Sequence, residues 1–299
     1  MTKPIAQSFK GRYACLLYDP TFKTVICTPE NEKLLIEILE LLIPDKHIST
    51  ITFLNNEHYG LTISEKKVIF DLLCKDDNTG EEFLVEVQNA SKSSYRDRML
   101  VYSTYPIREQ IAERLSRLSE EEIKKDKMDY SLKPIYVVSL VNFSFTHEDD
   151  AALEDGYISR YEIRNRLSGE VLTQSLHFVF LELDRMHFKP EEFGKCKTLL
   201  ERFVFSLKHM QSLEERPEGF EGTLLTKLFK ASELANMPTE QRIQYDRDMH
   251  TILDYYDEIN TAKKEAIETV AQAMLNKGFD VSDIAECTGF TIEEINRLK

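Results

Sequence analysis

The chain has 299 residues, of which 42% are hydrophobic and 30% are charged, and this is the composition of a globular protein. It excludes a disordered or fibrous chain, and the length accommodates one large domain or two ordinary ones. The formal net charge of -14 argues against strong non-specific nucleic-acid binding, which usually needs a basic surface. The same charge is compatible with a local basic strip and with acidic residues that hold a metal ion.

The cysteines and the N-terminal segment indicate the cellular compartment. The five cysteines are far apart and form no CxxC pair, so we expect neither a disulfide framework nor a zinc site. The opening MTKPIAQSFKGRYACLLYDP lacks the continuous apolar region of a signal peptide, and no apolar run reaches membrane-spanning length. We therefore expect a reduced, cytoplasmic protein of bacterial style with no membrane partner.

Hydrophobic periodicity predicts the elements in chain order. A helix with one apolar side is expected over 29–44, between two prolines. Strands are expected over 47–56, 66–76 and 81–90, the last two joined by the turn sequence DNTG. A long helix is expected over 93–117, with a proline inside it. Buried strands rich in β-branched and aromatic residues are expected over 134–145 and 176–186.

This order of helices and strands predicts an α/β or α+β domain over 1–190. The pattern is helical from there on, so 191–299 are expected to form a helical C-terminal region. Its tail, NKGFDVSDIAECTGFTIEEINRLK, resembles a helix-turn-helix with Gly289 at the turn. Because the second helix opens with Glu293 and Glu294, where phosphates would have to bind, packing or homo-oligomerisation is favoured over DNA binding.

Two carboxylates lie inside the apolar pattern of the predicted hairpin IFDLLCKDDNTGEEFLVEVQ. If the turn is centred on DNTG, residues whose numbers sum to 157 face each other, so Asp71 is opposite Glu86. Ile69 is then opposite Gln88, and Glu86 and Gln88 share one face because side chains alternate along a strand. A bulge at Gly80 would shift this register by one residue.

The paired carboxylates have two interpretations. Like charges directly opposite each other destabilise a sheet, and burial increases that cost. A divalent cation removes the conflict, since Mg²⁺ favours one or two carboxylates and can activate a bound water. From the pattern alone, the commoner arrangement is an exposed hairpin face, with Glu82, Glu86 and Gln88 in water.

A wider pattern carries a family resemblance. Asp71, the hairpin, the sequence EVQ and the following SSYRDRMLVYSTYPIREQI resemble the PD-(D/E)xK nuclease-family transposases, also called recombination-promoting nucleases. The resemblance covers most of the chain, from TPENEKLLIEILELLI to the tail helices. It implies a restriction-endonuclease-like core, a central mixed sheet flanked by helices, and DNA cleavage that depends on Mg²⁺ or Mn²⁺.

The resemblance also implies roles for individual residues. Asp71 and Glu86 would be metal ligands, and Gln88 would stand where the motif usually has lysine. An acid of the first helix often joins such sites, and the candidates are Glu30, Glu32 and Glu37.

The glutamine at the lysine position removes a positive charge that could orient water or stabilise a phosphate. Lys66, Lys67 and Lys75 are candidates to replace it. Arg98 and Tyr102 form an i, i+4 pair on the predicted helix and would contact the substrate, with Arg98 at a phosphate. From these two residues alone, a solvated helix face is the commoner interpretation.

The leading hypothesis is therefore a metal-dependent DNA endonuclease with Asp71, Glu86 and Gln88 as catalytic residues. No glycine-rich phosphate loop is present, so no nucleotide cofactor is expected. The alternative is a catalytically silent DNA- or protein-binding relative with the same fold, which the acidic balance favours. A transcription regulator acting through the tail is a third hypothesis.

Overall fold

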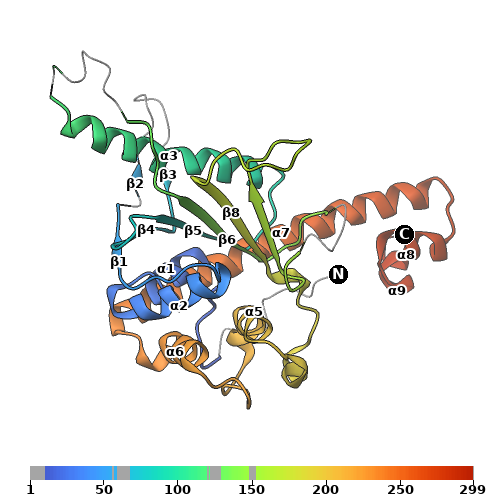
Figure 1. Cartoon of the computed structure of the whole chain (residues 1–299). Coiled ribbons are helices and arrows are strands. Elements are labelled where there is room, and N and C mark those ends of the chain that lie inside the picture. Colours follow the sequence, from blue (N-terminus) through green and yellow to red (C-terminus); the bar gives the residue numbers. More distant parts are fainter. Residues whose placement is uncertain are drawn as a thin grey trace. The chain divides into compact units, whose positions relative to one another are not determined.

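The computed structural model describes residues 11–55, 57–58, 68–119, 121, 129–147 and 153–298. By their internal contacts, Lys10–Gln241 form one compact unit and Arg242–Lys299 belong to a second, and each is described by itself. Figure 1 labels their elements. A domain boundary at residue 190 stays a prediction.

The larger unit is built on a mixed six-stranded sheet with the order β1-β4-β5-β6-β8-β7 (Figure 1). Its strands are β1 (Ile51–Phe53), β4 (Leu72–Asp76), β5 (Glu82–Gln88), β6 (Ile135–Val141), β7 (Ile158–Glu162) and β8 (Leu176–Glu182). The three central strands β5, β6 and β8 run parallel, and the other three are antiparallel to their neighbours. Two shorter strands, β2 (Glu57–His58) and β3 (Val68–Ile69), form a separate sheet.

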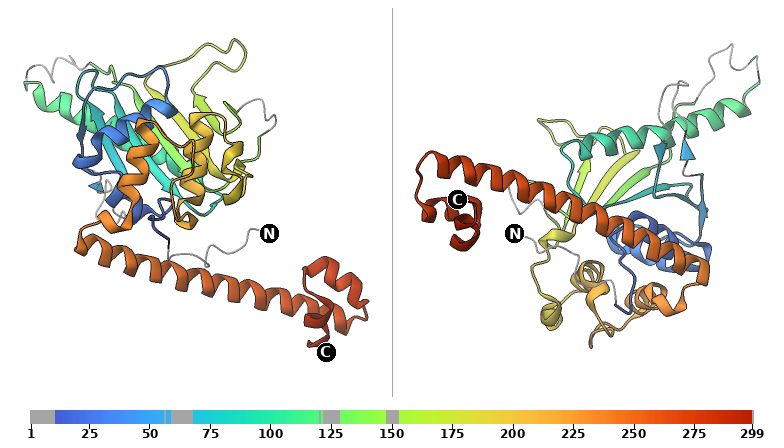
Figure 2. Two further views of the ribbon diagram at one scale, coloured as in Figure 1. Left: turned by 90° about the horizontal axis from the view of Figure 1, so that it is seen from below. Right: turned by 180° about the vertical axis from the view of Figure 1, so that it is seen from behind.

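Helices cover both faces of the six-stranded sheet. They are α1 (Asp19–Val25), α2 (Glu32–Leu42), α3 (Tyr95–Arg117), α5 (Leu199–His209) and α6 (Thr223–Ser232). Short 3₁₀ segments lie at Pro29–Asn31, Leu183–Arg185, Pro190–Lys195, Met210–Ser212 and Leu234–Asn236. Figures 1 and 2 show α3 on one face of the sheet and α1 and α2 on the other.

The long crossover helix α3 seals one face of the sheet. Its Tyr95 and Met99 pack with Leu73 of β4, Leu84 of β5 and Val137 of β6 in one buried cluster. The chain connects parallel β5 and β6 through this helix, because parallel neighbours cannot be joined by a tight turn. The helix continues through its internal Pro106 from Tyr95 to Arg117.

The hairpin of β4 and β5 has the predicted register. Leu73 pairs with Leu84 and Cys74 pairs with Phe83, so the paired numbers sum to 157. Gly80 adopts a φ of 73° in the turn, a conformation that glycine enters without steric cost, and the register is not shifted. The predicted helix over 29–44, the hairpin, the long helix and the strands over 134–145 and 176–186 are thus confirmed as α2, β4 with β5, α3, β6 and β8, whereas α1, β2 and the edge strand β7 were not predicted.

The second unit contains most of α7 (Thr239–Asn276), together with α8 (Val281–Thr288) and α9 (Ile292–Asn296). The last three helical segments bury Ala271, Ile284 and Ile295 together in a small core. Glu294 belongs to a capping box at the start of α9 and accepts from the backbone N–H of Thr291 at 2.9 Å. Across the described parts of the chain, no helix is long and apolar enough to cross a membrane.

Candidate functional site

Asp71 and Glu86 meet where β4 begins and β5 approaches its end. Their side chains are only 5% exposed each. The backbone N–H of Asp71 donates to Oε1 of Glu86 at 3.2 Å, and the N–H of Val87 donates to Oδ2 of Asp71 at 2.7 Å. The two carboxylates are therefore buried neighbours, and the interpretation of an exposed hairpin face is wrong.

Strand pairing ends at this point, and the bend at Asp71 explains why. The ladder between β4 and β5 stops at Leu72 with Val85. The carboxylate of Asp71 then accepts the hydrogen bond from the Val87 N–H. If β4 had continued, a backbone carbonyl of β4 would have accepted this bond instead. Ile69 instead pairs with Glu57 in the separate two-stranded sheet, so the predicted pairing of Ile69 with Gln88 is wrong.

Helix α1 brings a cation to the carboxylate pair. Nζ of Lys23 lies 3.1 Å from Oδ1 of Asp71, and the lysine side chain is 28% exposed. The first helix predicted from the sequence starts at Pro29, so neither α1 nor the position of Lys23 was predicted. The available signal was Pro20 in the first turn, a common helix-opening position.

Gln88 contacts Arg98 rather than standing alone at the edge of the site. Nη2 of Arg98 donates to Oε1 of Gln88. The guanidinium lies 4.9 Å from the ring centre of Tyr95 and 5.6 Å from that of Tyr102. Nε of Arg98 is buried without a hydrogen-bond partner. The amide oxygen and two aromatic rings thus hold the arginine beside Gln88, two residues beyond Glu86 on β5.

A second arginine lies in the same turn of α3. Arg96 stacks 4.2 Å from the ring centre of Phe145 and 5.5 Å from that of Tyr161, and it donates to the Tyr161 hydroxyl at 3.2 Å. Stacking on aromatic faces favours arginine over lysine. The start of α3 therefore carries two cations with restricted side chains, in a protein whose overall charge is acidic.

Most of the chain matches a known protein family. Residues 16–262 match the family model described as PD-(D/E)XK nuclease family transposase. The chain belongs to the PD-(D/E)XK nuclease family transposases. Comparisons with curated proteins and with solved structures gave no match. The match confirms the resemblance in the sequence, and the mixed sheet with flanking helices is the restriction-endonuclease-like fold expected of this family.

The family's usual third acidic residue is not supplied by the predicted candidates. Oε1 of Glu32 accepts from the backbone N–H of Ile51 at 3.0 Å, and Glu37 pairs with Lys227 at 2.5 Å. Among the described residues, no three His, Cys, Asp or Glu side chains form a group that could hold a metal. The structure therefore does not gather Glu30, Glu32 or Glu37 with Asp71 and Glu86 in such a group.

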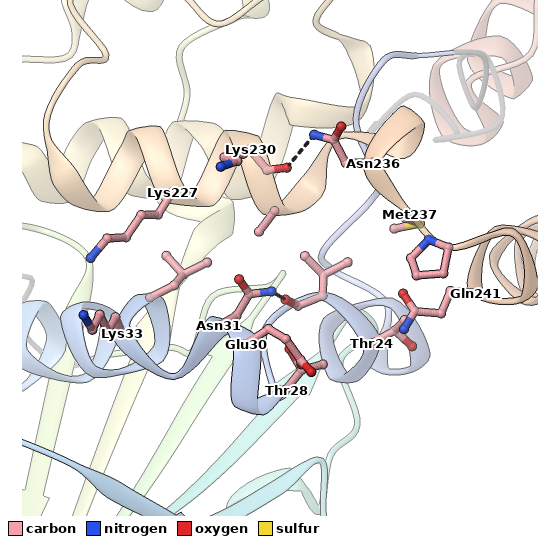
Figure 3. Close-up of a pocket in the computed structure, with 14 residues that line it drawn as sticks. Thr24, Thr28, Glu30, Asn31, Lys33, Lys227, Lys230, Asn236, Met237 and Gln241 are labelled. Carbon is pink, nitrogen blue, oxygen red and sulfur yellow. Dashed lines mark hydrogen bonds between the residues drawn. The ribbon is translucent and has the colours of Figure 1, made fainter.

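Glu30 lines a separate cavity of about 570 Å³. Figure 3 shows Glu30 and Asn31 on one wall and Lys227 and Lys230 of α6 on the opposite wall. Asn31 is fixed by donating to the carbonyl of Val25 at 2.7 Å. The lining includes none of the other predicted site residues, so this cavity is distinct from the carboxylate pair.

The predicted replacement lysines do not reach the pair in the described structure. Lys75 lies on β4 opposite Glu82, toward the far end of the hairpin from Asp71. Lys66 and Lys67 lie outside the described residues. The lysine beside Asp71 is instead Lys23, from an element far away in the chain.

The tyrosines around Arg98 stay neutral. Burial raises the pKa of Tyr95, and the negative charge of Glu86 adds to the effect. Burial likewise raises the pKa of Tyr102, again with a contribution from Glu86. Neither phenol is a base near neutral pH, and both serve as stacking surfaces for the guanidinium.

A further buried acid, Glu182 at the end of β8, is committed to structure. Its side chain is fully buried and accepts from the Phe145 N–H at 3.0 Å and from Arg185 Nε at 3.0 Å. His147 Nε2 lies 2.6 Å from its other oxygen. Because buried polar groups are satisfied here on both oxygens, Glu182 is a poor candidate for a ligand.

The donor set at Asp71 and Glu86 fits a hard divalent cation. Carboxylate oxygens are the ligands that Mg²⁺ and Mn²⁺ prefer, and Mg²⁺ is commonly held by one or two carboxylates together with water and substrate phosphate. Two neighbouring buried carboxylates also need compensating positive charge, of which Lys23 supplies one. The pair could therefore bind such an ion without a third protein ligand.

Proposed function

We propose that the protein is a metal-dependent DNA endonuclease that hydrolyses phosphodiester bonds, with Asp71 and Glu86 as ligands of Mg²⁺ or Mn²⁺. The observation that carries the proposal is the burial of these two acids side by side near the start of β4 and the end of β5, where the backbone N–H of Asp71 donates to the Glu86 carboxylate. Neighbouring buried carboxylates need compensating positive charge, and a bound divalent cation would add to that of Lys23. Membership of a nuclease family supports DNA as the substrate.

The residues around the proposed metal ligands would bind the DNA and orient the side chains of the site. The backbone N–H of Val87 fixes one oxygen of Asp71, which holds the carboxylate in one direction. Gln88 orients Arg98 through its amide oxygen, and Tyr102 limits the motion of the guanidinium. Arg98 then contacts a DNA phosphate close to the scissile bond. The bound ion would supply an activated water and neutralise charge on the attacked phosphate.

Plasmid nicking tests this function directly. Wild type should nick supercoiled DNA with Mg²⁺ or Mn²⁺, and EDTA should stop the reaction. Asp71→Asn should lower the rate by at least about 100-fold, because it removes a charged ligand while keeping the side chain's shape. Asp77→Asn, on an exposed acid of the same hairpin, is the matched control and should nick at the wild-type rate. Equal nicking by wild type and Asp71→Asn would show that the site is wrong.

A catalytically silent DNA- or protein-binding relative is the second candidate. Gln88 at the motif's lysine position favours it, as does the lack of a third acidic ligand among the described residues. Calorimetric titration with Mn²⁺ separates the two candidates. Absence of Mn²⁺ binding, together with unchanged DNA binding by Asp71→Asn, would support the silent relative.

For the tail we propose packing or self-association rather than DNA contact. The second helix of the tail starts with acidic residues, and the carboxylate of Glu294 is engaged with the backbone of its own helix. Phosphate contacts would have to overcome that negative charge. Light scattering of the full chain tests self-association, and salt-dependent duplex binding that is lost on deleting the residues after Thr261 would contradict this role.

A further inference from the structure

We propose that Lys23 is the cationic residue of this site. It would neutralise Asp71 while no metal is bound, and it would contact the reacting phosphate during cleavage. The inference rests on the proposed nuclease function and assigns to Lys23 the charge that the motif's usual lysine would carry. Lys23 comes from α1, outside the hairpin that carries the motif.

The two oxygens of Asp71 have different partners. Oδ2 accepts the Val87 N–H at 2.7 Å, so the backbone of β5 fixes the orientation of the carboxylate. Oδ1 faces the ammonium of Lys23 at 3.1 Å. A buried carboxylate beside a second carboxylate is stable only with a nearby positive charge, and Lys23 provides one.

The neighbouring residues of α1 fix its backbone, while the lysine side chain is partly exposed. Phe22 and Val25 are 1% and 3% exposed, and α1 packs against β5. The ammonium ends a flexible four-carbon chain with a partly exposed side chain. It can therefore move from Asp71 toward a bound phosphate by rotating its side chain, without displacement of the helix.

Arg98 and Lys75 have surroundings that differ from those of Lys23. Arg98 is held by Gln88 and lies between two tyrosine rings, and Lys75 lies opposite Glu82. Gln88 itself is neutral and cannot stabilise negative charge on a phosphate in the way an ammonium does. Lys23 combines contact with a predicted metal ligand and access to solvent, which a substrate-contacting lysine needs.

This placement has a consequence for metal affinity. An ammonium that contacts Asp71 competes with a divalent cation for the same oxygen, and the two like charges repel each other. Removing the charge of Lys23 should therefore tighten metal binding even as it slows cleavage. General damage to the site would weaken both properties, so the opposite changes distinguish this role from a structural one.

Lys23→Met tests the proposal, because methionine keeps an unbranched apolar chain and removes the charge. Lys46→Met is the matched control, since Lys46 forms an ion pair with Glu81 at 2.7 Å and is 24% exposed. Mn²⁺ affinity is measured by calorimetry without DNA, and plasmid nicking is measured at saturating Mn²⁺. We expect Lys23→Met to bind Mn²⁺ about tenfold more tightly and to nick at least about 100-fold more slowly. Lys46→Met should match wild type in both.

The opposing outcomes are equally definite. Unchanged or weaker Mn²⁺ binding by Lys23→Met overturns the proposal, and so does nicking at the wild-type rate. Lys23→Arg, which keeps the charge, should leave Mn²⁺ affinity near that of wild type. If wild type itself does not nick DNA, the proposed nuclease function fails, and the Mn²⁺ comparison then decides alone whether Lys23 is the counter-ion of Asp71.

Discussion

Glu82 and Glu86 lie at opposite ends of β5, on the same face of the sheet, and are 7% and 5% exposed. Glu82 accepts from the neutral side-chain amide of Gln110 at 3.1 Å, and burial raises the pKa of its carboxyl to about 7. Glu86 instead contacts Asp71, which is paired with Lys23. The two ends of β5 therefore accommodate their buried acids differently. Glu82 is favoured in its protonated form, whereas Glu86 lies beside an acid that is paired with a lysine.

This difference shows which buried acid suits metal chemistry. A carboxyl that holds a proton near neutral pH is a poor ligand for a divalent cation, because ligands bind in their deprotonated form. A carboxylate pair next to a cation is already in an environment that stabilises negative charge. Burial of an acid in a strand is thus an insufficient criterion for a metal site, and the partners of its oxygens decide.

The largest expected effect separates the two glutamates by activity. Glu86→Gln should lower plasmid nicking by at least about 100-fold, because it would remove the charge of a proposed metal ligand. Glu82→Gln is the matched control, since it makes the same change on the same strand at a similarly buried position. It should nick at the wild-type rate. Similar losses in both variants would break the comparison between the two ends of β5.

A smaller effect is expected when the motif's usual lysine is restored. Gln88→Lys should lower nicking about tenfold, because lysine cannot accept from Arg98 and places a second cation beside it. DNA affinity, measured by fluorescence anisotropy, should fall in parallel as Arg98 loses its anchor. In an Arg98→Met background, Gln88→Lys should cause a smaller loss of nicking activity. Faster nicking by Gln88→Lys than by wild type would contradict this account of the glutamine.

The smallest effect concerns the pH dependence of stability at Glu82. Because its pKa is raised in the folded protein, the carboxyl of Glu82 stabilises the fold most at pH values below its pKa in the unfolded chain. This stabilisation is lost as pH rises to about 7. Glu82→Gln keeps an oxygen that can accept from Gln110 and removes the ionisation. The difference in unfolding free energy between Glu82→Gln and wild type should therefore shift in favour of the variant by about 1–2 kcal/mol from pH 5 to pH 8. Chemical denaturation at the two pH values measures this, and a pH-independent difference would contradict the assigned pKa.

Local patterns in the sequence predicted the hairpin and its register. The turn sequence DNTG and the alternation on either side of it act over a few residues, so the pairing of Leu73 with Leu84 could be derived. Burial of Asp71 and Glu86 could not be derived in the same way. The same alternation fits a solvent-exposed face of the hairpin, and only the packing of α3 over the sheet makes that face part of the core.

The remaining errors arise where distant elements meet. Helix α1 spans only seven residues, too few for a clear helical period, so the sequence predicted neither this helix nor the position of Lys23. Glu32 and Glu37 were candidates by position, but their partners Ile51 and Lys227 belong to other elements. The sequence also treated Gln88 and Arg98 as separate residues, although one orients the other.

The sequence by itself determined the family, the order of the main strands and helices, and the residues that stand opposite each other in the hairpin, because these depend on local periodicity and motif spacing. Only the tertiary structure decided that the two acids are buried together, that α1 supplies the cation beside Asp71, and that Gln88 holds Arg98. Such contacts depend on how helices pack against the sheet, and no short-range pattern along the chain encodes which side chains that packing brings together.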